Sequence, residues 1–303
     1  MSGPAFVPPE AAARLDWLAL TDALAEGHGR PRARLEDVFL RRGADTILSR
    51  AAWIEGLGAL VKTATIWPGN RDAPTVNGAV TLFSDQDGTL EAVLDFHLVT
   101  KWKTAGDSLL AARRLARPDA ASVLIVGAGA VAASLREAYG ALLPEARFRV
   151  WNRTRPRAEA LAARYPRTEV APDLAAAVRE AEIVTVATMS AEPVIRGAWL
   201  APGTHLDLIG AYRADMREAD DAAIAAGRLF LDARETVLGH IGELADPIAR
   251  GVLGEGDVVA DFYELDRFRR GSPDEITVFK NGGGAHLDLM TARHILDRWR
   301  GAA

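Results

Sequence analysis

Apolar and polar residues along the first hundred positions follow two different periods. Leucines recur at helical spacing between positions 15 and 24, which predicts an amphipathic helix over 11–27. The pattern then shortens to apolar runs typical of strands, at 45–50 and 58–67. Two further runs, 78–83 and 90–95, flank a glycine-containing loop and predict a β-hairpin. This region is therefore predicted to be a small, mostly antiparallel sheet with one helix.

The pattern of apolar and polar residues changes after residue 103, where strand-like runs begin to alternate with helical segments. A helix is predicted over 104–115, which would make Asp107 and Ser108 first-turn residues. The alternation that follows predicts a parallel, doubly wound sheet, so the fold class is α/β. The predicted strands are 122–126, 147–151, 182–187, 204–209 and 228–232, and the predicted helices are 131–143, 156–164, 173–180, 218–226 and 287–300.

The first strand of this alternation leads into a dinucleotide-binding pattern. The apolar run Val123-Leu-Ile-Val126 passes into Gly127-x-Gly129-x-x-Ala132 and then into a helical segment. Gly127 permits a tight turn, Gly129 lets the backbone approach a pyrophosphate, and Ala132 lets helix and strand pack closely. The helix N-terminus adds N–H groups and a partial positive charge. An ordinary small-residue helix start is the alternative, but a second strand follows at the distance that nucleotide binding requires.

The end of the second strand indicates which dinucleotide is bound. An acidic residue there would bind the ribose 2′-hydroxyl of NAD(H). The chain instead reads Asn152-Arg-Thr-Arg-Pro-Arg157, which has three arginines and no carboxylate. This segment predicts a 2′-phosphate and therefore NADPH. NADH is the alternative if these arginines are ordinary surface residues.

Composition excludes several classes of function. The chain has 303 residues, 49% hydrophobic and 25% charged, which is typical of a globular protein with a large core. A net charge of -5 argues against a nucleic-acid partner. The absence of cysteine excludes disulfides and thiol catalysis, and the six histidines lack metal-ligand spacing, so no metal is predicted. Neither a membrane span nor a signal peptide is recognisable, so a cytoplasmic protein without a membrane partner is expected.

Lysine is rare in this chain, since only four of its 36 basic residues are lysines. A lysine kept against this bias suggests a need for a compact ammonium or a tunable pKa. Lys62 lies inside an apolar strand, where it either points to solvent or lines a site. Lys103 lies at the start of the predicted helix, where a cation opposes the helix dipole unless it faces an anion such as a substrate carboxylate.

These segments together resemble the ornithine cyclodeaminase/mu-crystallin family over nearly the whole chain. Val61-Lys-Thr-x-x-x-x-Pro68-x-Asn70 is similar to the first site strand of the family. Thr100-Lys-Trp-Lys-Thr-Ala-Gly106 is similar to its T-x-x-R-T-A-A helix start, with Lys103 in place of the usual arginine and Gly106 in place of the second alanine. Gly127-Ala-Gly-Ala-Val131 resembles its nucleotide loop.

Two further segments refine the resemblance. Val278-Phe-Lys-Asn-Gly-Gly-Gly-Ala-His-Leu-Asp288 is similar to the closing signature of the family, with Asn281 where serine is usual. Segments 150–154 and 210–218 are most similar to the mu-crystallin ketimine-reductase branch. The resemblance implies a homodimer in which residues 1–115 and 287–303 form the dimerisation and substrate domain. Residues 116–286 would form the Rossmann dinucleotide-binding domain.

The resemblance also implies a set of site residues. Lys62 and Lys103 are expected to handle an α-carboxylate and the reacting C=N group, and Asn70 and His97 to line the substrate pocket, with His286 as another residue in a site segment. The predicted cofactor contacts are Thr104, Gly127, Gly129, Ala130, Val131, Asn152, Arg153, Thr154, Arg157, Thr188, Met189, Asn281 and Gly282.

One departure from the family bears on the reaction. Cyclodeaminases carry an aspartate two residues after the glycine that matches Gly210, and this chain has Tyr212 there. A phenol either walls the pocket or donates a proton, so Lys62 and Tyr212 are the predicted catalytic residues. The leading hypothesis is NADPH-dependent reduction of a ketimine that bears an α-carboxylate, such as Δ1-pyrroline- or Δ1-piperideine-2-carboxylate. The alternatives are an ornithine cyclodeaminase or NAD-dependent amino-acid dehydrogenase, and a nucleotide-binding protein without turnover.

Overall fold

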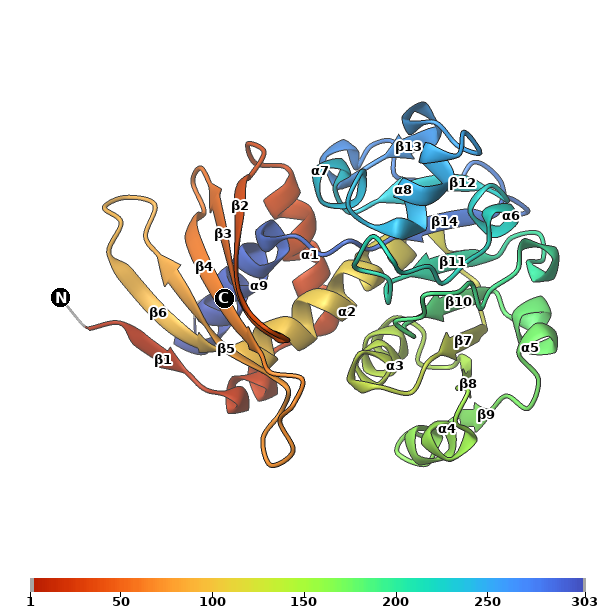
Figure 1. Ribbon diagram of the computed structural model, residues 1–303, viewed down its shortest axis with the longest axis horizontal. Helices are drawn as coiled ribbons and strands as arrows, with labels where there is room; N and C mark the ends of the chain where they lie inside the picture. The colour runs from red at the N-terminus through yellow and green to blue at the C-terminus, as the bar shows by residue number, and fades with distance from the viewer. Residues whose placement is uncertain (1–2, 302–303) are drawn as a thin grey trace. The chain divides into compact units, whose positions relative to one another are not determined.

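The computed structural model describes residues 3–301, which divide into two compact units (Figure 1). Unit 1 comprises the chain up to Gly106 together with the segment from Gly283 onward, and unit 2 comprises Asp107–Gly282. Helix α2 (Phe96–Leu115) contains the first of the two boundaries. Within the described residues, no helix combines the length and the apolar character needed to cross a membrane.

Unit 1 is built on a six-stranded sheet with the strand order β1-β6-β5-β4-β3-β2. Neighbouring strands are antiparallel, except that β1 pairs with β6 in parallel. The C-terminal helix α9 packs against β3, β4 and β5 and against α1. The elements are β1 (Ala5–Val7), η1 (Pro9–Arg14), α1 (Trp17–His28), β2 (Arg34–Arg42), β3 (Asp45–Ile54), β4 (Gly58–Ile66), β5 (Val76–Phe83), β6 (Leu90–Asp95) and α9 (Ala285–Arg300).

The period of two along β4 explains why its lysine is buried. Leu60, Lys62 and Ala64 alternate with more exposed residues and lie on the same face of the strand. The register places Leu82 and Val80 of β5 beside Leu60 and Lys62. This face packs against α9, so Lys62 points into the core of unit 1 rather than to solvent.

Unit 2 is built on an eight-stranded, all-parallel sheet with the order β13-β12-β14-β11-β10-β7-β8-β9. The strand order reverses between β7 and β10, as in a doubly wound Rossmann fold. The strands are β7 (Ser122–Val126), β8 (Arg147–Trp151), β9 (Thr168–Val170), β10 (Ile183–Val186), β11 (His205–Leu208), β12 (Arg228–Leu231), β13 (Val258–Ala260) and β14 (Thr277–Lys280). The helices are α3 (Ala130–Leu142), α4 (Arg155–Ala162), α5 (Leu174–Glu180), η2 (Gly197–Trp199), α6 (Asp221–Ile224), α7 (Arg234–Val237), α8 (Gly242–Ala249), η3 (Glu255–Asp257) and η4 (Phe262–Glu264).

The predicted fold class is confirmed, because a doubly wound parallel sheet and a separate, mostly antiparallel sheet with helices are both present. Val123, Leu124, Ile125 and Val126 are buried on both faces of the central strand, as their apolar character predicts. The strands β1, β2, β9, β13 and β14 were not predicted as strands. The segment predicted as helix 218–226 is helical only over Asp221–Ile224, where Asp220 caps the first turn.

The prediction for the helix after β6 was wrong at its start. Asp95 accepts a hydrogen bond from the backbone N–H of Leu98 (2.7 Å), so the helix begins at Phe96 and not at residue 104. Lys103 therefore lies in the helix interior, and the argument from the helix dipole does not apply to it. Asp107 and Ser108 are likewise interior residues rather than first-turn residues.

Candidate active site and cofactor site

A buried ion pair joins the middle of β4 to the first turns of α9 in unit 1. The Lys62 ammonium donates to Oδ1 of Asp288 at 2.8 Å, and Lys62 is only 6% exposed. The ammonium also lies 4.8 Å from the ring centroid of Phe96, which is the first residue of α2. The alternative that Lys62 points to solvent is therefore wrong.

Two further cations act on the same carboxylate. Lys103 of α2 is 6% exposed, and its positive charge lowers the pKa of Asp288. Arg50 of β3 pairs with Lys62 across the sheet and forms an ion pair with Asp37 at 3.0 Å. We call Lys62, Lys103, Arg50 and Asp288 the lysine cluster. Within residues 3–301, the Lys103 ammonium forms no hydrogen bond or ion pair.

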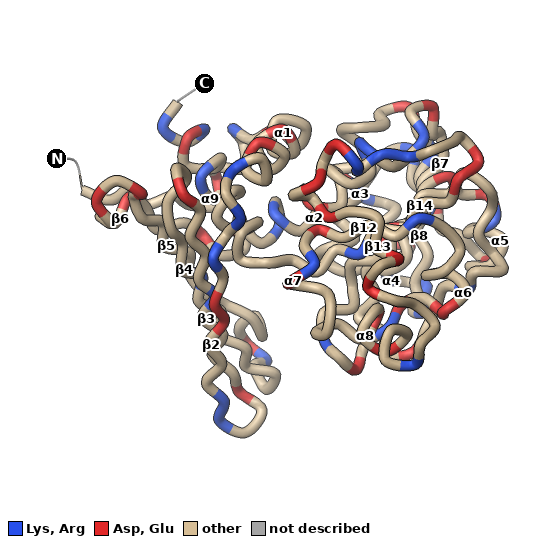
Figure 2. Tube along the Cα trace, turned by 90° about the horizontal axis from the view of Figure 1, so that it is seen from above, with Lys and Arg blue, Asp and Glu red and all other residues tan. Residues whose placement is uncertain are grey.

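The charges of the lysine cluster leave one positive charge uncompensated. Asp288 neutralises Lys62 and Asp37 neutralises Arg50, which leaves Lys103 without a carboxylate of its own. Elsewhere, basic positions are interspersed with acidic ones along both units (Figure 2). A buried cation without a counterion is costly unless a ligand supplies one. This arrangement fits an anionic ligand group such as a carboxylate.

Burial and neighbouring charges set the protonation states of the pair. Burial lowers the pKa of Lys62 to about 8, and Lys103 and Arg50 act in the same direction, whereas Asp288 opposes the shift. Burial tends to raise the pKa of Asp288, but Lys103, Lys62 and Arg50 together hold it below its usual value. Asp288 is therefore ionised at neutral pH, and Lys62 keeps its proton up to about pH 8. A group with this pKa is suited to transferring a proton near neutral pH.

The other predicted substrate residues lie in less buried positions. Asn70 lies in the β4–β5 loop, where its amide donates to the backbone carbonyl of Pro74 at 3.0 Å. His97 is exposed in the first turn of α2, with its ring edge against Phe96. Tyr212 is 55% exposed in the loop that follows β11. Their roles in substrate binding and catalysis stay predictions.

The loop between β7 and α3 in unit 2 has the shape that a dinucleotide requires. Gly127 has a φ of +119°, and a Cβ there would lie 2.5 Å from the carbonyl oxygen of Ala187, so only glycine fits. A Cβ on Gly129 would meet nothing within 4 Å, which leaves the backbone open to a ligand. No side chain caps the N-terminus of α3, so its first N–H groups are available to phosphate. These residues fit the pyrophosphate of NAD(P)H.

The segment after β8 carries the predicted contacts to the 2′-phosphate. The Asn152 side-chain amide donates to the backbone carbonyl of Thr154 at 2.9 Å. Thr154 occupies the N-cap position of α4, but its hydroxyl accepts no hydrogen bond from the first turn of that helix. Arg155 forms an ion pair with Glu159 on the same helix. In the described part of the chain, the guanidinium groups of Arg153 and Arg157 form no hydrogen bond or ion pair. Both side chains are exposed and available to a phosphate.

Four of the remaining predicted cofactor residues lie at the carboxyl ends of other parallel strands, whereas Thr104 lies in the interior of α2 in unit 1. Thr188 and Met189 follow β10, which neighbours β7 at the reversal of strand order. Asn281 and Gly282 follow β14, where the Asn281 amide donates to the Ser108 hydroxyl at 3.1 Å. The Gly282 N–H donates to Asp232 at 3.0 Å. Ligands of doubly wound folds bind at this edge of the sheet, so these positions are compatible with the predicted roles.

Three functional candidates had no assigned role in the sequence analysis, namely Asp288, Arg50 and Glu218. Asp288 lies between two leucines of α9, and an acidic residue in such an apolar stretch is a signal of a buried partner. Glu218 is completely buried and accepts hydrogen bonds from two loops of unit 2. No local pattern marks Arg50, because its neighbours in the cluster come from distant parts of the chain.

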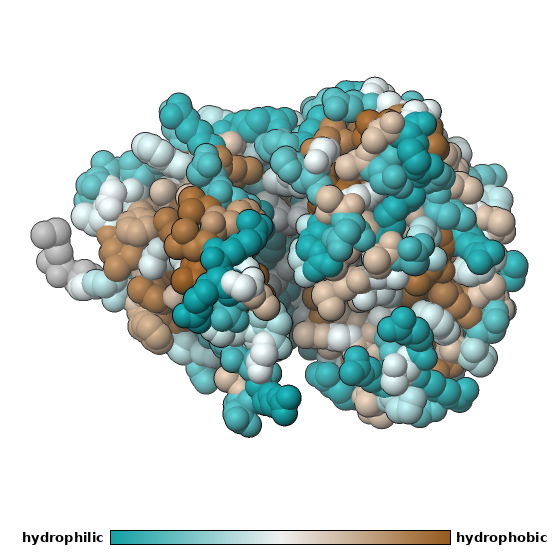
Figure 3. Space-filling view, viewed as in Figure 1, coloured by the Kyte–Doolittle hydropathy of each residue, from teal (hydrophilic) through white to brown (hydrophobic). Residues whose placement is uncertain are grey.

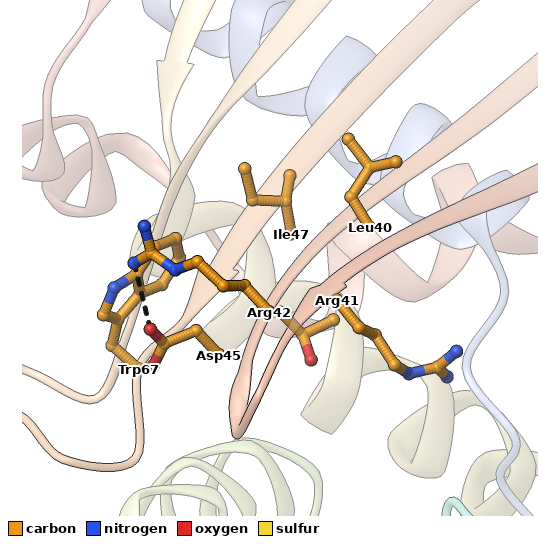
Figure 4. Close-up of a pocket in the computed structure, with 7 residues that line it drawn as sticks. Leu40, Arg41, Arg42, Asp45, Ile47 and Trp67 are labelled. Carbon is orange, nitrogen blue, oxygen red and sulfur yellow. Dashed lines mark hydrogen bonds and ion pairs between the residues drawn. The ribbon is translucent and has the colours of Figure 1, made fainter.

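A hollow at the β2–β3 hairpin contains none of the predicted site residues. Two of its lining residues, Arg42 and Asp45, form an ion pair at 3.1 Å, as Figure 4 shows. The hollow is lined by Leu40, Arg41, Arg42, Asp45, Thr46, Ile47 and Trp67. It offers no buried titratable group, so the lysine cluster is the better candidate for an active site.

Comparison with known proteins finds relatives that match most of this chain. Delta(1)-pyrroline-2-carboxylate reductase of Paracoccus denitrificans is 53% identical over 97% of this chain and 96% of its own length. Ketimine reductase mu-crystallin of Mus musculus is 32% identical over 78% of this chain and 75% of its own length.

The structure of Thermococcus litoralis Delta(1)-pyrroline-2-carboxylate reductase in complex with NADH and L-proline has the same fold. It superposes with a TM-score of 0.89 over 98% of this chain and 97% of that chain, at 23% identity. Residues 53–303 match the sequence profile of the ornithine cyclodeaminase/mu-crystallin family. The chain therefore belongs to the ornithine cyclodeaminase/mu-crystallin family.

Proposed function

We propose that this protein is an NAD(P)H-dependent reductase of cyclic ketimines that bear an α-carboxylate, with Δ1-pyrroline-2-carboxylate as the first substrate to test. The observation that carries the proposal is the lysine cluster, in which Asp288 neutralises Lys62 and Asp37 neutralises Arg50, but no carboxylate of the described residues forms an ion pair with Lys103. A substrate carboxylate supplies the missing negative charge. The relative from Paracoccus denitrificans, which is named for reduction of this compound, supports the same choice of substrate.

The chemistry divides between the two lysines. Lys103, which has no counterion of its own within residues 3–301, binds the substrate carboxylate. Lys62 holds a proton up to about pH 8 and donates it to the ring nitrogen as the C=N bond is reduced. NAD(P)H supplies the hydride when it is bound. Asp288 holds Lys62 in place and stabilises its protonated form.

The outcome with ornithine distinguishes this reductase from a cyclodeaminase. Amine elimination needs a group that takes and returns protons near neutral pH, a task that suits a carboxylate better than the phenol that Tyr212 offers. We expect consumption of reduced cofactor with Δ1-pyrroline- or Δ1-piperideine-2-carboxylate and no ammonia release from ornithine with NAD⁺. Ammonia release at a rate comparable to imine reduction would contradict the proposal.

Tyr212 itself is tested in the same assay. If the Tyr212 ring only lines the substrate pocket, Tyr212→Phe should retain most of the imine-reduction activity. If its hydroxyl supplies the proton instead of Lys62, the rate falls by ~10-fold or more. Unchanged activity in this variant would leave Lys62 as the proton donor.

The finer cofactor preference rests on the segment after β8. Because Arg153 and Arg157 are exposed and not engaged in ion pairs, we expect NADPH to bind more tightly than NADH. Charge-assisted bonds to the 2′-phosphate are worth roughly 1.5–3 kcal/mol, which corresponds to about tenfold or more in affinity. Fluorescence titration of both cofactors measures this difference.

A variant with both arginines replaced by alanine tests the cause of that preference. It should bind NADPH and NADH with similar affinity while its affinity for NADH stays close to that of the wild type. Arg164→Ala is the matched control, because this arginine is exposed at the end of the same helical region and should change neither affinity. Equal affinities in the wild-type protein would contradict the preference for NADPH.

The outer face of the unit 1 sheet favours a homodimer. Hydrophobic atoms gather over the strands of this unit in the view of Figure 3. The register places five exposed apolar side chains on the face opposite Lys62, and an exposed apolar patch on a sheet is typical of a protein–protein interface. Sedimentation velocity measures the association. The exposed apolar side chains on this face are Phe6, Val38, Leu40, Trp53 and Val61.

A further inference from the structure

Glu218 of unit 2 connects two loops at the carboxyl edge of the Rossmann sheet. Its Oε1 accepts hydrogen bonds from the backbone N–H of Thr188 (2.6 Å) and from the Thr188 hydroxyl (2.7 Å). Its Oε2 accepts from the backbone N–H groups of Gly210 (2.5 Å) and Ala211 (3.2 Å). One completely buried carboxylate therefore fixes the chain where it leaves β10 and where it leaves β11.

The surrounding backbone is shaped to admit this carboxylate. A Cβ on Gly210 would collide with the Glu218 carboxylate and would lie 2.6 Å from the backbone nitrogen of Thr188. Only glycine therefore allows Glu218 to reach the Thr188 loop. This close approach explains a glycine that has no positive φ to require it.

Glu218 is itself held from both sides. Its backbone N–H donates to Glu243 of α8 at 2.9 Å. Its backbone carbonyl accepts from the N–H groups of Val194 and Ile195, both at 2.9 Å. The loop after β10 is thus anchored to Glu218 at its beginning through Thr188, and at its end through Val194 and Ile195.

Between these anchors the loop contains a strained residue. Met189 has a φ of +57°, in the left-handed region that non-glycine residues avoid, and its side chain is exposed. Such a conformation persists only where the surrounding structure imposes it. The two bonds from Thr188 to Glu218 hold the chain before Met189, and the backbone N–H of Arg217, next to Glu218, donates to the carbonyl of Ser190 after it at 3.0 Å.

We propose that Glu218 is a positioning residue that shapes the Thr188–Met189 loop for NAD(P)H and so sets the affinity for the cofactor. The proposal rests on the proposed function, because it assumes that this edge of the sheet binds NAD(P)H. Glu218 acts through Thr188 and touches neither substrate nor cofactor. Its removal therefore affects cofactor binding more than the chemical step.

The protonation of Glu218 gives a second readout. Burial raises its pKa to about 7, Lys280 of β14 lowers it, and Glu243 of α8 raises it. Among the charged groups, Lys280 and Glu243 have the largest effects on this pKa, and the hydrogen bonds from Thr188 also lower it. A protonated carboxyl group loses one of its acceptor sites, so the loop should loosen as the pH falls through about 7. Cofactor affinity should therefore be lower on the acid side of this value.

The test is Glu218→Gln in the full-length protein, with the Kd for NADH and for NADPH measured by fluorescence without substrate. Glutamine keeps the shape but cannot accept all four bonds, so we expect the Kd to rise about tenfold or more. We expect kcat at saturating cofactor to stay near the wild-type value, and the acid-side loss of affinity to disappear. Asp220→Asn is the matched control, because the Asp220 side chain also accepts two backbone N–H bonds in unit 2 but contacts neither Thr188 nor Met189.

Three outcomes would overturn the inference. They are an unchanged Kd in Glu218→Gln, an equal rise in Asp220→Asn, and a fall in kcat without a change in Kd. If Glu218→Gln does not fold, titration of the wild-type protein decides, and a Kd that is the same on both sides of pH 7 overturns the inference. A wild-type protein that binds neither cofactor would instead overturn the proposed function.

Discussion

Lys62→Ala is expected to lower kcat/KM for imino-acid reduction by ~10²-fold or more, the scale of a lost acid–base or charge-stabilising group. The structure gives this expectation a specific reason, because the Lys62 ammonium is buried and held 2.8 Å from Asp288. Alanine at this position removes the proton and leaves Asp288 as a buried carboxylate. Steady-state consumption of NADPH with Δ1-pyrroline-2-carboxylate measures the effect.

Two other lysines provide the comparison for this variant. Lys103→Arg keeps the positive charge, so it should act mainly through KM and do less harm. Lys101→Ala removes a lysine two residues away on the same helix and should leave the kinetics close to wild type. A folded Lys62→Ala protein with near-normal kcat/KM would exclude Lys62 from the reaction. Circular dichroism and thermal unfolding establish whether the variant is folded.

Much of the Rossmann unit could be predicted because its signals are local. Val123–Val126 form an unbroken apolar run, and Gly127 and Gly129 follow at fixed spacing, so strand, turn and helix are encoded in one segment. The glycine at 127 is required by its positive φ and by the carbonyl of Ala187. Such requirements act on neighbouring residues and can be recognised in sequence.

The start of α2 shows how a local signal can be missed. The helix begins after Asp95, whose side chain caps the first turn, but the apolar strand before it masks this signal. Lys103 was placed at a helix N-terminus for this reason and was expected to face an anion. The reason was wrong, although the burial of Lys103 without an ion pair to any described residue now supports an anionic ligand by a different argument.

The contacts within the lysine cluster could not be predicted from sequence. Lys62 and Asp288 are 226 positions apart, and only the packing of α9 on the unit 1 sheet brings them together. The sequence contains both residues within recognisable segments, but it does not indicate which face of β4 is buried. Glu218 is similar, because its four acceptor contacts lie on loops that follow two different strands.

Asp288→Asn is expected to shift the pH dependence of the reaction to lower pH. Asp288 is the group that raises the pKa of Lys62 against the effect of burial, so its neutralisation should move that pKa below about 8. As the pH rises through the pKa, Lys62 loses the proton that it donates, and kcat/KM falls. A shift of one unit lowers the protonated fraction of Lys62 by about fivefold near pH 8 and by about tenfold at higher pH, and kcat/KM should fall by the same factors.

The stability of the same variant should depend on pH in a defined direction. Breaking a buried ion pair typically costs ~3–5 kcal/mol, because the remaining charge is left without its partner. In Asp288→Asn this penalty is present while Lys62 is protonated in the folded state, and it diminishes as the pH rises and the folded protein releases that proton near or below pH 8. Denaturant titrations at several pH values measure the free energy of unfolding. Asp297→Asn is the control, because Asp297 lies on the same helix, α9, but is only partly buried. Two outcomes would show that Asp288 does not set the protonation of Lys62. One is a decline of kcat/KM at alkaline pH in Asp288→Asn that matches the wild-type protein, and the other is an equal shift of this decline in Asp297→Asn.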